Sequence, residues 1–429
     1  IWTEVTQDNV SDGRLTLAGG GSYYLGTNIA ISNGITINGT VNLCLNGHSI
    51  TKTSESDTFH GVIKVESGSS FTLCDCNGSG MGNGKITHAD GVTGRGVLVG
   101  SSSVKTTFFL MYGGTISGNR INGQDGAGVR VHNASFKMYG GTISENHVEG
   151  TPSDGGGGVY INSQDLAVTG GSIINNNAAD GSGGGVYFNV DGSSFNVSGN
   201  VSITGNKKGA TPTGSGLIGA DNNVYLPDGK IITVGGALNG SDKIGVTTEN
   251  TPNDSNYVRI ALGNKDYTDP EKFRYENNDT IAVSAVVSGS TATLVACQHN
   301  WTGEWTTDDT QHWKECSICK GKNDVSGHNY DEMFVADGYK KSDANCKSPA
   351  VYYKSCVCGA KGTDTFTSGE TNPDNHAGTL SGWQWNEDKH WKKYSCCHAE
   401  AEKGEHAWDE GEVTEAATCT AAGEKTYTC

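Results

Sequence analysis

A short motif that recurs along the chain constrains its fold more than any other feature. It reads "MYGGTISGN" at 111–119 and "MYGGTISEN" at 138–146, with weaker copies in "VTGGSIINN" at 168–176 and "VSGNVSITGN" at 197–206. A repeat of this length is the signature of a solenoid, in which each unit forms one coil and stacks on the next. The motif therefore predicts a stack of similar coils.

A second motif alternates with the first and always follows the same order. Its copies are "GRGVLVG" at 94–100, "GAGVRVHN" at 126–133, "GGGVYIN" at 156–162, "GGGVYFN" at 183–189 and "DNNVYLP" at 221–227. In both motifs apolar and polar residues alternate, which is the period of a β-strand, and Gly-rich turns separate the strands. The residues predicted to point inward are Val129, Val131, Phe136, Met138, Val159, Ile161, Val186, Phe188, Phe195, Val197, Val224 and Leu226.

Four asparagines close the copies of the first motif and should form a ladder at one turn: Asn119, Asn146, Asn176 and Asn206. A unit this short cannot bury its own apolar face, whereas stacking buries it and pairs each strand with its equivalent in the next coil. No regular leucine pattern or helical segment favours a leucine-rich repeat. We therefore predict an all-β fold, a right-handed parallel β-helix. Its expected parts are an N-terminal cap (1–40), regular coils (41–240) and closing coils with a C-terminal cap (241–296).

The repeats resemble the β-helix region of secreted surface proteins from Gram-positive gut bacteria. They are also similar to the "GG-[AGV]-[IV]…N" repeats of autotransporter-type adhesins. The resemblance covers about 41–238 and implies a parallel β-helix on a secreted or cell-surface protein. It specifies the fold more than the function, because β-helices carry lyases, glycosidases, adhesins and inert stalks alike.

Composition and charge exclude several kinds of partner. The formal net charge is −17, which argues against nucleic acid and against an anionic membrane surface. No apolar run approaches the roughly 18–20 residues of a membrane span, so we expect no membrane insertion within this chain. The chain begins at Ile1 rather than Met, as it would after removal of an export signal.

Composition changes abruptly near Cys297. From that residue onward lie 10 of the 13 Cys, 7 of the 8 Trp and 7 of the 12 His. The segment at 377–429 repeats the pattern of 297–376, so the tail is predicted to hold two copies of a composite Cys/His/Trp module. Because the second copy ends in mid-motif, we expect the natural chain to continue beyond Cys429.

Two chemistries fit the cysteines and histidines of the tail. Structural zinc is one, because a Cys-x-x-Cys pair with nearby His supplies its tetrahedral ligands. One expected site combines Cys316, Cys319 and His328 with His299 or His312, and a second combines Cys346, Cys356, Cys358 and His376. Disulfides are the alternative in an exported protein. Nothing in the pattern singles out a catalytic metal.

The tail also resembles small Cys/His modules near the C-termini of Gram-positive surface proteins, which look like zinc ribbons. It departs from that pattern at Tyr394, where the second copy lacks its first Cys, and in the Cys-x-Cys of 356–358. The resemblance implies structural zinc rather than catalysis.

A further cysteine pair lies in the first coils. Alignment of "VNLCLNGHSI" with "SFTLCDCNG" places Cys44 opposite Cys74 on neighbouring strands, roughly 4.8 Å apart. A disulfide can bridge that distance, so Cys44 and Cys74 are a candidate pair. Two unbridged thiols are the alternative.

No catalytic constellation emerges from the sequence, which lacks a phosphate loop and a nucleophile elbow. Because Val159 and Ile161 point inward, Tyr160 should point outward. Tyr187 and Tyr225 should extend that row, Arg130 should begin it, and Tyr112 and Tyr139 should form a second row. Such rows can stabilise neighbouring strands. They can equally hold a glycan, because tyrosine combines an apolar face with a polar tip.

We therefore expect a non-catalytic secreted or cell-surface protein that acts in adhesion or glycan binding, with glycans or host and cell-surface polymers as partners. One alternative is a polysaccharide lyase or glycosidase whose carboxylates come from loops. Another is a structural element of a surface filament or layer, in which chains associate end to end.

Overall fold

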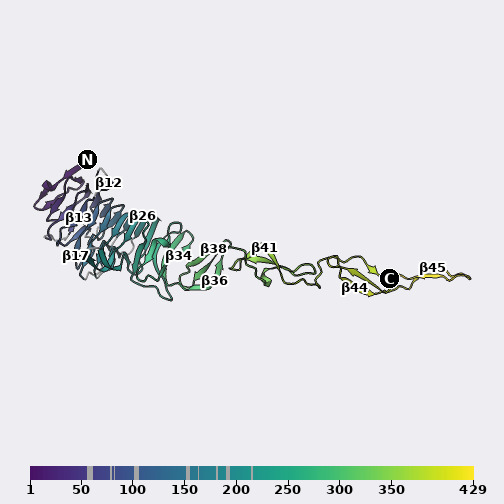
Figure 1. Ribbon diagram of the computed structural model, residues 1–429. Helices are drawn as coiled ribbons and strands as arrows, with labels where there is room; N and C mark the ends of the chain where they lie inside the picture. The colour runs from purple at the N-terminus through teal and green to yellow at the C-terminus, as the bar shows by residue number, and fades with distance from the viewer. Residues whose placement is uncertain are drawn as a thin grey trace. The chain divides into compact units, whose positions relative to one another are not determined.

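The computed structural model describes residues 1–55, 61–77, 80–81, 83–100, 106–150, 155–162, 164–179, 182–189, 194–213 and 216–429 (Figure 1). Regular structure in these residues is β-strand, apart from the short 3₁₀ helices η1 (Gln7–Asn9), η2 (Pro270–Lys272) and η3 (Asp337–Tyr339). The chain forms two compact units. The first comprises residues 1–302 and 315–323, and the second comprises 303–314 and 324–429.

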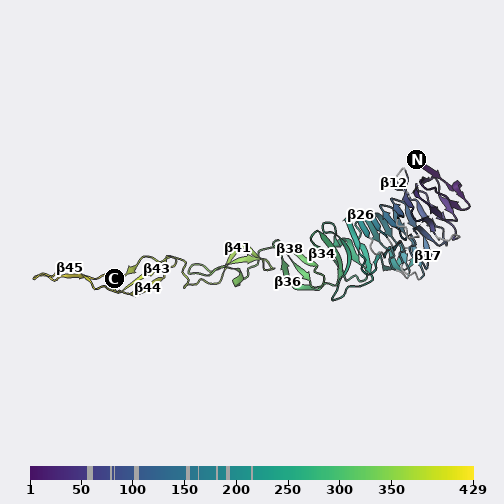
Figure 2. The ribbon, with the colours of Figure 1, turned by 180° about the vertical axis from the view of Figure 1, so that it is seen from behind.

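The first unit is built from stacked strands, which lie side by side from purple to green in both views (Figures 1 and 2). The largest sheet contains β1 (Trp2–Val5), β4 (Ser22–Leu25), β5 (Ile29–Ile31), β7 (Thr40–Cys44), β8 (Ile50–Lys52), β10 (Ser70–Cys74), β13 (Lys85–His88), β15 (Phe108–Met111), β16 (Thr115–Ser117), β19 (Ser135–Met138), β20 (Thr142–Ser144), β23 (Leu166–Ile174), β26 (Phe195–Thr204), β30 (Ile232–Leu238), β32 (Val258–Asn264), β34 (Ala282–Ser288) and β35 (Thr291–Cys297).

Two further parallel sheets complete the coils. One contains β6 (Ile35–Ile37), β9 (Gly61–Val65), β14 (Arg95–Val99), β18 (Val129–Val131), β22 (Val159–Ile161), β25 (Val186–Phe188), β29 (Val224–Leu226), β31 (Ile244–Thr248) and β33 (Phe273–Tyr275). The other contains β17 (Arg120–Asn122), β21 (His147–Glu149), β24 (Asn177–Ala178), β27 (Lys207–Thr213) and β28 (Gly216–Asp221), the last of which pairs antiparallel. Short hairpins join β2 (Val10–Ser11) to β3 (Arg14–Leu15) and β11 (Cys76–Asn77) to β12 (Gly80–Met81).

Strand register follows the repeat, which confirms the parallel β-helix. Val159 pairs with Val129 in the preceding coil and with Val186 in the next, and all three are fully buried. Because equivalent residues stack, the inward side chains form one continuous apolar core along the coils. The parallel pairing also includes β1, β4 and β5, which pair through β7 and β8 with the coils that follow.

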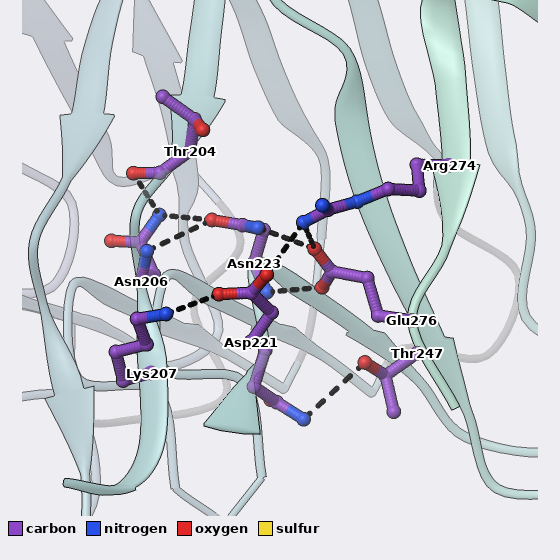
Figure 3. Close-up of polar contacts among 9 residues, drawn as sticks. Thr204, Asn206, Lys207, Asp221, Asn223, Thr247, Arg274 and Glu276 are labelled. Atoms are coloured by element: carbon purple, nitrogen blue, oxygen red, sulfur yellow. Dashed lines mark hydrogen bonds and ion pairs between the residues drawn. The ribbon is translucent and has the colours of Figure 1, made fainter. Parts of the chain in front are cut away.

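The asparagine ladder is present and is longer than predicted. Each of Asn119, Asn146 and Asn176 donates from Nδ2 to Oδ1 of the next asparagine over 2.9 Å. Asn206 continues the series to Asn223, which belongs to the second motif rather than to the first. Figure 3 shows the end of the ladder, where the Glu276 carboxylate accepts hydrogen bonds from the Asn223 amide groups and pairs with Arg274.

Antiparallel strands close the β-helix. β35 pairs antiparallel with both β32 and β34, so the parallel order ends there. The tail that follows contains small sheets formed by β36 (Trp301–Thr307), β37 (Gln311–Cys316) and β38 (Lys322–Gly327), by β39 (Lys340–Ser342), β40 (Ala350–Ser355) and β41 (Lys361–Ser368), by β42 (Gln384–Trp385), β43 (Lys389–Lys393) and β44 (Glu400–Glu405), and by β45 (Glu412–Glu415) and β46 (Glu424–Thr426).

Candidate metal centres

The cysteines and histidines of the tail gather into tetrads that could bind a metal such as zinc. The first tetrad belongs to the first unit and consists of Cys297, His299, Cys316 and Cys319, whose donor atoms all lie within 4.8 Å of one another. Cys297 ends β35 and Cys316 ends β37, while Cys319 lies in the turn that follows. The closing strand of the β-helix and the first tail hairpin therefore share this tetrad.

Donor distances in the first tetrad fit a tetrahedral ion. Bonds of about 2.3 Å to sulfur and about 2.0–2.1 Å to nitrogen would separate neighbouring donors by roughly 3.6–3.8 Å. The Sγ atoms of Cys297 and Cys316 are 3.9 Å apart, and Cys319 Sγ lies 3.4 Å from Nδ1 of His299. All three cysteines are buried, so little water can reach the centre.

A second tetrad lies in the second unit and consists of His312, His328, Cys356 and Cys358. Cys356 Sγ is 3.4 Å from Nδ1 of His312, and Cys358 Sγ is 3.3 Å from Nδ1 of His328. Both rings therefore turn Nδ1 towards the sulfurs. The histidines come from β37 and from the end of β38, whereas the cysteines follow β40 in the next sheet.

The outer nitrogens of these histidines have partners of their own. Nε2 of His299 lies 2.9 Å from Oγ of Ser284, and Nε2 of His312 lies 3.1 Å from Oγ of Ser326. Nε2 of His328 donates to the carbonyl oxygen of Asp308 over 2.9 Å. Such contacts orient the imidazole rings, as is usual for metal-binding histidines.

The third tetrad consists of Cys346, His376, Cys396 and Cys397. Cys346 Sγ lies 3.0 Å from Cys396 Sγ, and Cys397 Sγ lies 3.2 Å from Nδ1 of His376. Cys346 lies between β39 and β40 and His376 follows β41, whereas Cys396 and Cys397 follow β43 of the next sheet. All four residues are half-buried, so this tetrad is more open than the first.

One cysteine in each tetrad is poised to lose its proton, the form that binds metal. Burial alone would raise the pKa of Cys316, but the Cys319 backbone N–H and the His299 ring lower it to about 6. Burial would also raise the pKa of Cys356, but hydrogen bonds from the Cys358 backbone and from His328 lower it to about 7. Hydrogen bonding from Cys346 lowers the pKa of Cys396 to about 6.

Every predicted ligand lies in a tetrad, and part of each predicted grouping is present, because Cys316 and Cys319 lie with His299 and Cys356 lies with Cys358. His328 does not join Cys316 and Cys319, and Cys346 and His376 do not join Cys356 and Cys358. The reason is that the tetrads combine ligands from successive sheets rather than from one continuous segment. Cys297, Cys396 and Cys397 were missed as ligands. The signal for Cys396 and Cys397 was the second copy of the module, in which Cys396 stands two positions after Tyr394.

A fourth group repeats the second tetrad within the last module and consists of His390, His406 and Cys429. Cys429 Sγ lies 3.6 Å from Nδ1 of His390, and Nε2 of His406 donates to the Asn386 carbonyl oxygen over 2.8 Å. Nδ1 of His406 is buried without a hydrogen-bond partner, which suits a nitrogen that faces a metal position. The group lies in a cavity of about 540 Å³ whose walls include Trp383, Trp385, Trp408 and Tyr427.

The first tyrosine row is stacked, with 5.5 Å between the ring centroids of Tyr160 and Tyr187 and 5.2 Å between those of Tyr187 and Tyr225. Two of its members are buried, because Tyr160 is 4% and Tyr187 8% exposed. A Cβ on Gly156 would lie 2.7 Å from Cβ of Tyr160, so the Gly-rich turn folds tightly against this row. The guanidinium of Arg130 lies 5.9 Å from the Tyr160 ring centroid.

The second tyrosine row is open to solvent. Tyr112 is 52% and Tyr139 44% exposed, and their rings stack with 4.7 Å between centroids and 14° between planes. They follow β15 and β19, which pair in register.

Elsewhere on the β-helix, Tyr257 is exposed beside a polar cavity of about 820 Å³ whose lining includes Asp228, Glu249, Asn253, Asn256 and Arg259.

Cys44 and Cys74 are register partners on β7 and β10, as the alignment indicated. Their thiols are free in this structure. A third thiol, that of Cys76, also approaches Cys44, with 3.2 Å between the Sγ atoms.

Comparison of the chain with known protein families, with curated proteins and with solved structures finds no match. In the described part of the chain, none of the helices has the length and apolar character needed to cross a bilayer.

Proposed function

We propose that this chain is a secreted or cell-surface protein that binds glycans without catalysis, and that its tail is held together by structural zinc. The exposed Tyr112–Tyr139 pair supports the glycan-binding part of this proposal. The pair presents aromatic surface on a rigid parallel sheet, where side-chain positions are fixed by the strands beneath them.

The surroundings of the pair suit a sugar chain. Phe108 begins β15 and is 36% exposed, so it adds a third aromatic ring to the same strand face. Lys137 and Leu110 are register partners on this face and are half-buried. Aromatic rings offer apolar surface to the C–H groups of a sugar, while the tyrosine hydroxyls and the lysine ammonium can hydrogen-bond its hydroxyl groups.

The tetrads support the zinc part of the proposal. Their donor sets are three Cys with one His, or two Cys with two His, which are the combinations that hold structural zinc. Four protein ligands leave no position for a substrate or water. Zinc in these tetrads would therefore stabilise the tail rather than take part in a reaction.

The glycan-binding proposal is tested by retention of the purified chain on immobilised mucin glycans and plant polysaccharides. We expect Tyr112→Ala and Tyr139→Ala each to weaken retention about fivefold, because each removes half of the stacked surface and a contact worth roughly 1 kcal/mol. Tyr257→Ala is the matched control, since it removes another exposed tyrosine from the same unit. Its retention should equal that of the wild type.

Three results would contradict the proposal. Equal retention of all variants would exclude the tyrosine pair as the contact surface, and loss of retention only in Tyr257→Ala would move the site to the polar cavity. New reducing or unsaturated ends in the bound polysaccharide would show catalysis, which the proposal excludes.

A further inference from the structure

Three cysteine thiols converge at one corner of the first coils, and their contacts are unequal. Cys44 ends β7, Cys74 ends β10, and Cys76 begins the short β11–β12 hairpin. The Sγ atoms of Cys44 and Cys76 are 3.2 Å apart, and the Cys76 backbone N–H donates to Cys44 Sγ over 3.4 Å. The Cys74 thiol instead donates to the Leu43 carbonyl oxygen over 3.6 Å.

Asp75 lies between Cys74 and Cys76 in the sequence, and its side chain is anchored at this corner. Asp75 is 6% exposed, and its carboxylate accepts hydrogen bonds from the backbone N–H of Gly47 at 2.7 Å and of Gly84 at 2.8 Å. These bonds anchor the Asp75 side chain to the backbone at Gly47 and Gly84. All three sulfurs lie within 4.8 Å of one another, and Cys76 contacts Cys44 twice, through the Sγ–Sγ approach and through its backbone N–H.

From this geometry we infer that Cys44 and Cys76 form a redox-active disulfide, with Cys74 remaining a free thiol. An S–S bond is about 2.05 Å long, so the two sulfurs need to approach by little more than 1 Å. The bond would tie the coil that contains β7 to the β11–β12 hairpin. This assignment replaces the Cys44–Cys74 pair expected from strand alignment, and it does not depend on glycan binding or on zinc.

A low-molecular-weight disulfide would oxidise the two thiols in two steps, and the exposure of Cys76 and Cys44 sets which thiol reacts first. Cys76 is exposed, so its thiolate attacks the incoming disulfide, forms a mixed disulfide and releases one thiol. Cys44, which is 5% exposed, then attacks the Cys76 sulfur and releases the second thiol. Two protein thiols are oxidised and one small disulfide is reduced to two thiols.

Cys74 is poorly suited to either step. Burial, followed by the proximity of Cys44, raises the pKa of its thiol to about 12. The pKa of Cys76 is also raised, chiefly by its hydrogen bond with Cys44. The thiolate is the nucleophile in disulfide exchange, so Cys74 should react more slowly.

Peptide mapping of the full chain tests the assignment. The protein is treated with oxidised glutathione, its remaining thiols are alkylated under denaturing conditions, and it is digested without reductant by trypsin and by a protease that cleaves before Asp. Cleavage before Asp75 separates Cys74 in peptide 65–74 from Cys76 in peptide 75–85, while Cys44 lies in peptide 15–52. We expect peptide 15–52 linked to 75–85, with peptide 65–74 alkylated.

Two single-cysteine variants test which thiols form the linkage. Cys74→Ser should leave the linkage intact, whereas Cys76→Ser should abolish it. A link between 15–52 and 65–74 in the wild type would overturn the assignment, as would alkylation of all three cysteines after oxidation. If a variant fails to fold, the wild-type map still distinguishes these outcomes.

Discussion

His147 is a titratable side chain held in the interior of the third parallel sheet. It occupies the same register position as Arg120 in the preceding coil and Asn177 in the next. The residue is 6% exposed, and its Nδ1 is buried without a hydrogen-bond partner. Burial disfavours the charged ring and the nearby Arg120 adds repulsion, which together lower the pKa of His147 to about 4 from 6.5, despite the opposing effect of Glu149.

This depressed pKa predicts a loss of stability in mild acid. Below pH 6.5 the unfolded chain binds a proton at His147 that the folded chain does not bind, so stability falls as pH drops towards 4. The full shift corresponds to about 3 kcal/mol in the free energy of unfolding.

The matched variant is His147→Asn, because asparagine occupies the same register position one coil later. Urea unfolding at pH 7 and at pH 4 should show a smaller loss of stability for the variant than for the wild type. Equal losses in the two proteins would rule out His147 as the titrating group.

At the scale of the elements, the asparagine ladder ends on a buried charge. The Glu276 side chain is 1% exposed and forms an ion pair with Arg274 at 2.8 Å. Its two oxygens accept the Asn223 backbone N–H at 2.8 Å and Asn223 Nδ2 at 2.6 Å. Arg274 also pairs with Asp221 at 2.8 Å, and Lys207 reaches the other oxygen of that carboxylate (Figure 3).

Glu276→Gln should destabilise the closing coils by about 2–3 kcal/mol, because the NH₂ of the new amide leaves a buried N–H of Asn223 without its acceptor. Asp221→Asn is the control, since its carboxylate is 36% exposed and its ion pairs should contribute less than about 1 kcal/mol. Urea unfolding, combined with hydrogen exchange at the Asn223 amide, measures both changes. Similar effects of the two substitutions would contradict a special role for the buried carboxylate.

The repeat motifs predicted the coils well, because stacking forces equivalent residues into register. Val41 aligned with Phe71 and Leu43 with Leu73, as they do on β7 and β10. The end of the ladder was not predictable in this way. Asn223 belongs to the second motif and Glu276 to the closing strands, so their approach depends on how the chain closes rather than on the repeat.

The solvent exposure of the tyrosine side chains could not be predicted from strand alternation either. Alternation places Tyr160 on the outer side of its strand, yet its side chain is 4% exposed and packs between the Tyr187 ring and the Arg130 guanidinium. In the tail, residue types identified the members of the tetrads, because 10 of the 13 Cys and 7 of the 12 His lie there. Their grouping depends on which sheets adjoin, and a linear pattern does not contain that information.

At the scale of the whole molecule, the chain combines parts that are stabilised in different ways. The β-helix has a continuous apolar core. Residues 357–429 are all described, and none of them is buried. A segment of this size without a core needs cross-links or metal ions to fold, and structural zinc can supply roughly 10–16 kcal/mol per site.

We therefore expect chelation to unfold the tail while the β-helix stays intact. Removal of zinc should expose residues 357–429 to limited proteolysis and leave a protected fragment that contains the coils. Metal analysis separates the sites: Cys397→Ser should lower the zinc content by one ion per chain. Cys419→Ser should not lower it, because Cys419 is exposed and lies outside the tetrads.

The same assay separates zinc from disulfides as the source of tail stability. In the presence of both a thiol reductant and zinc, the tail should resist proteolysis, because reduced cysteines are the form that binds metal. If disulfides held the tail, the reductant would expose it whether or not zinc is present, and chelation alone would have no effect. Protection that survives chelation but not reduction would thus overturn the zinc proposal.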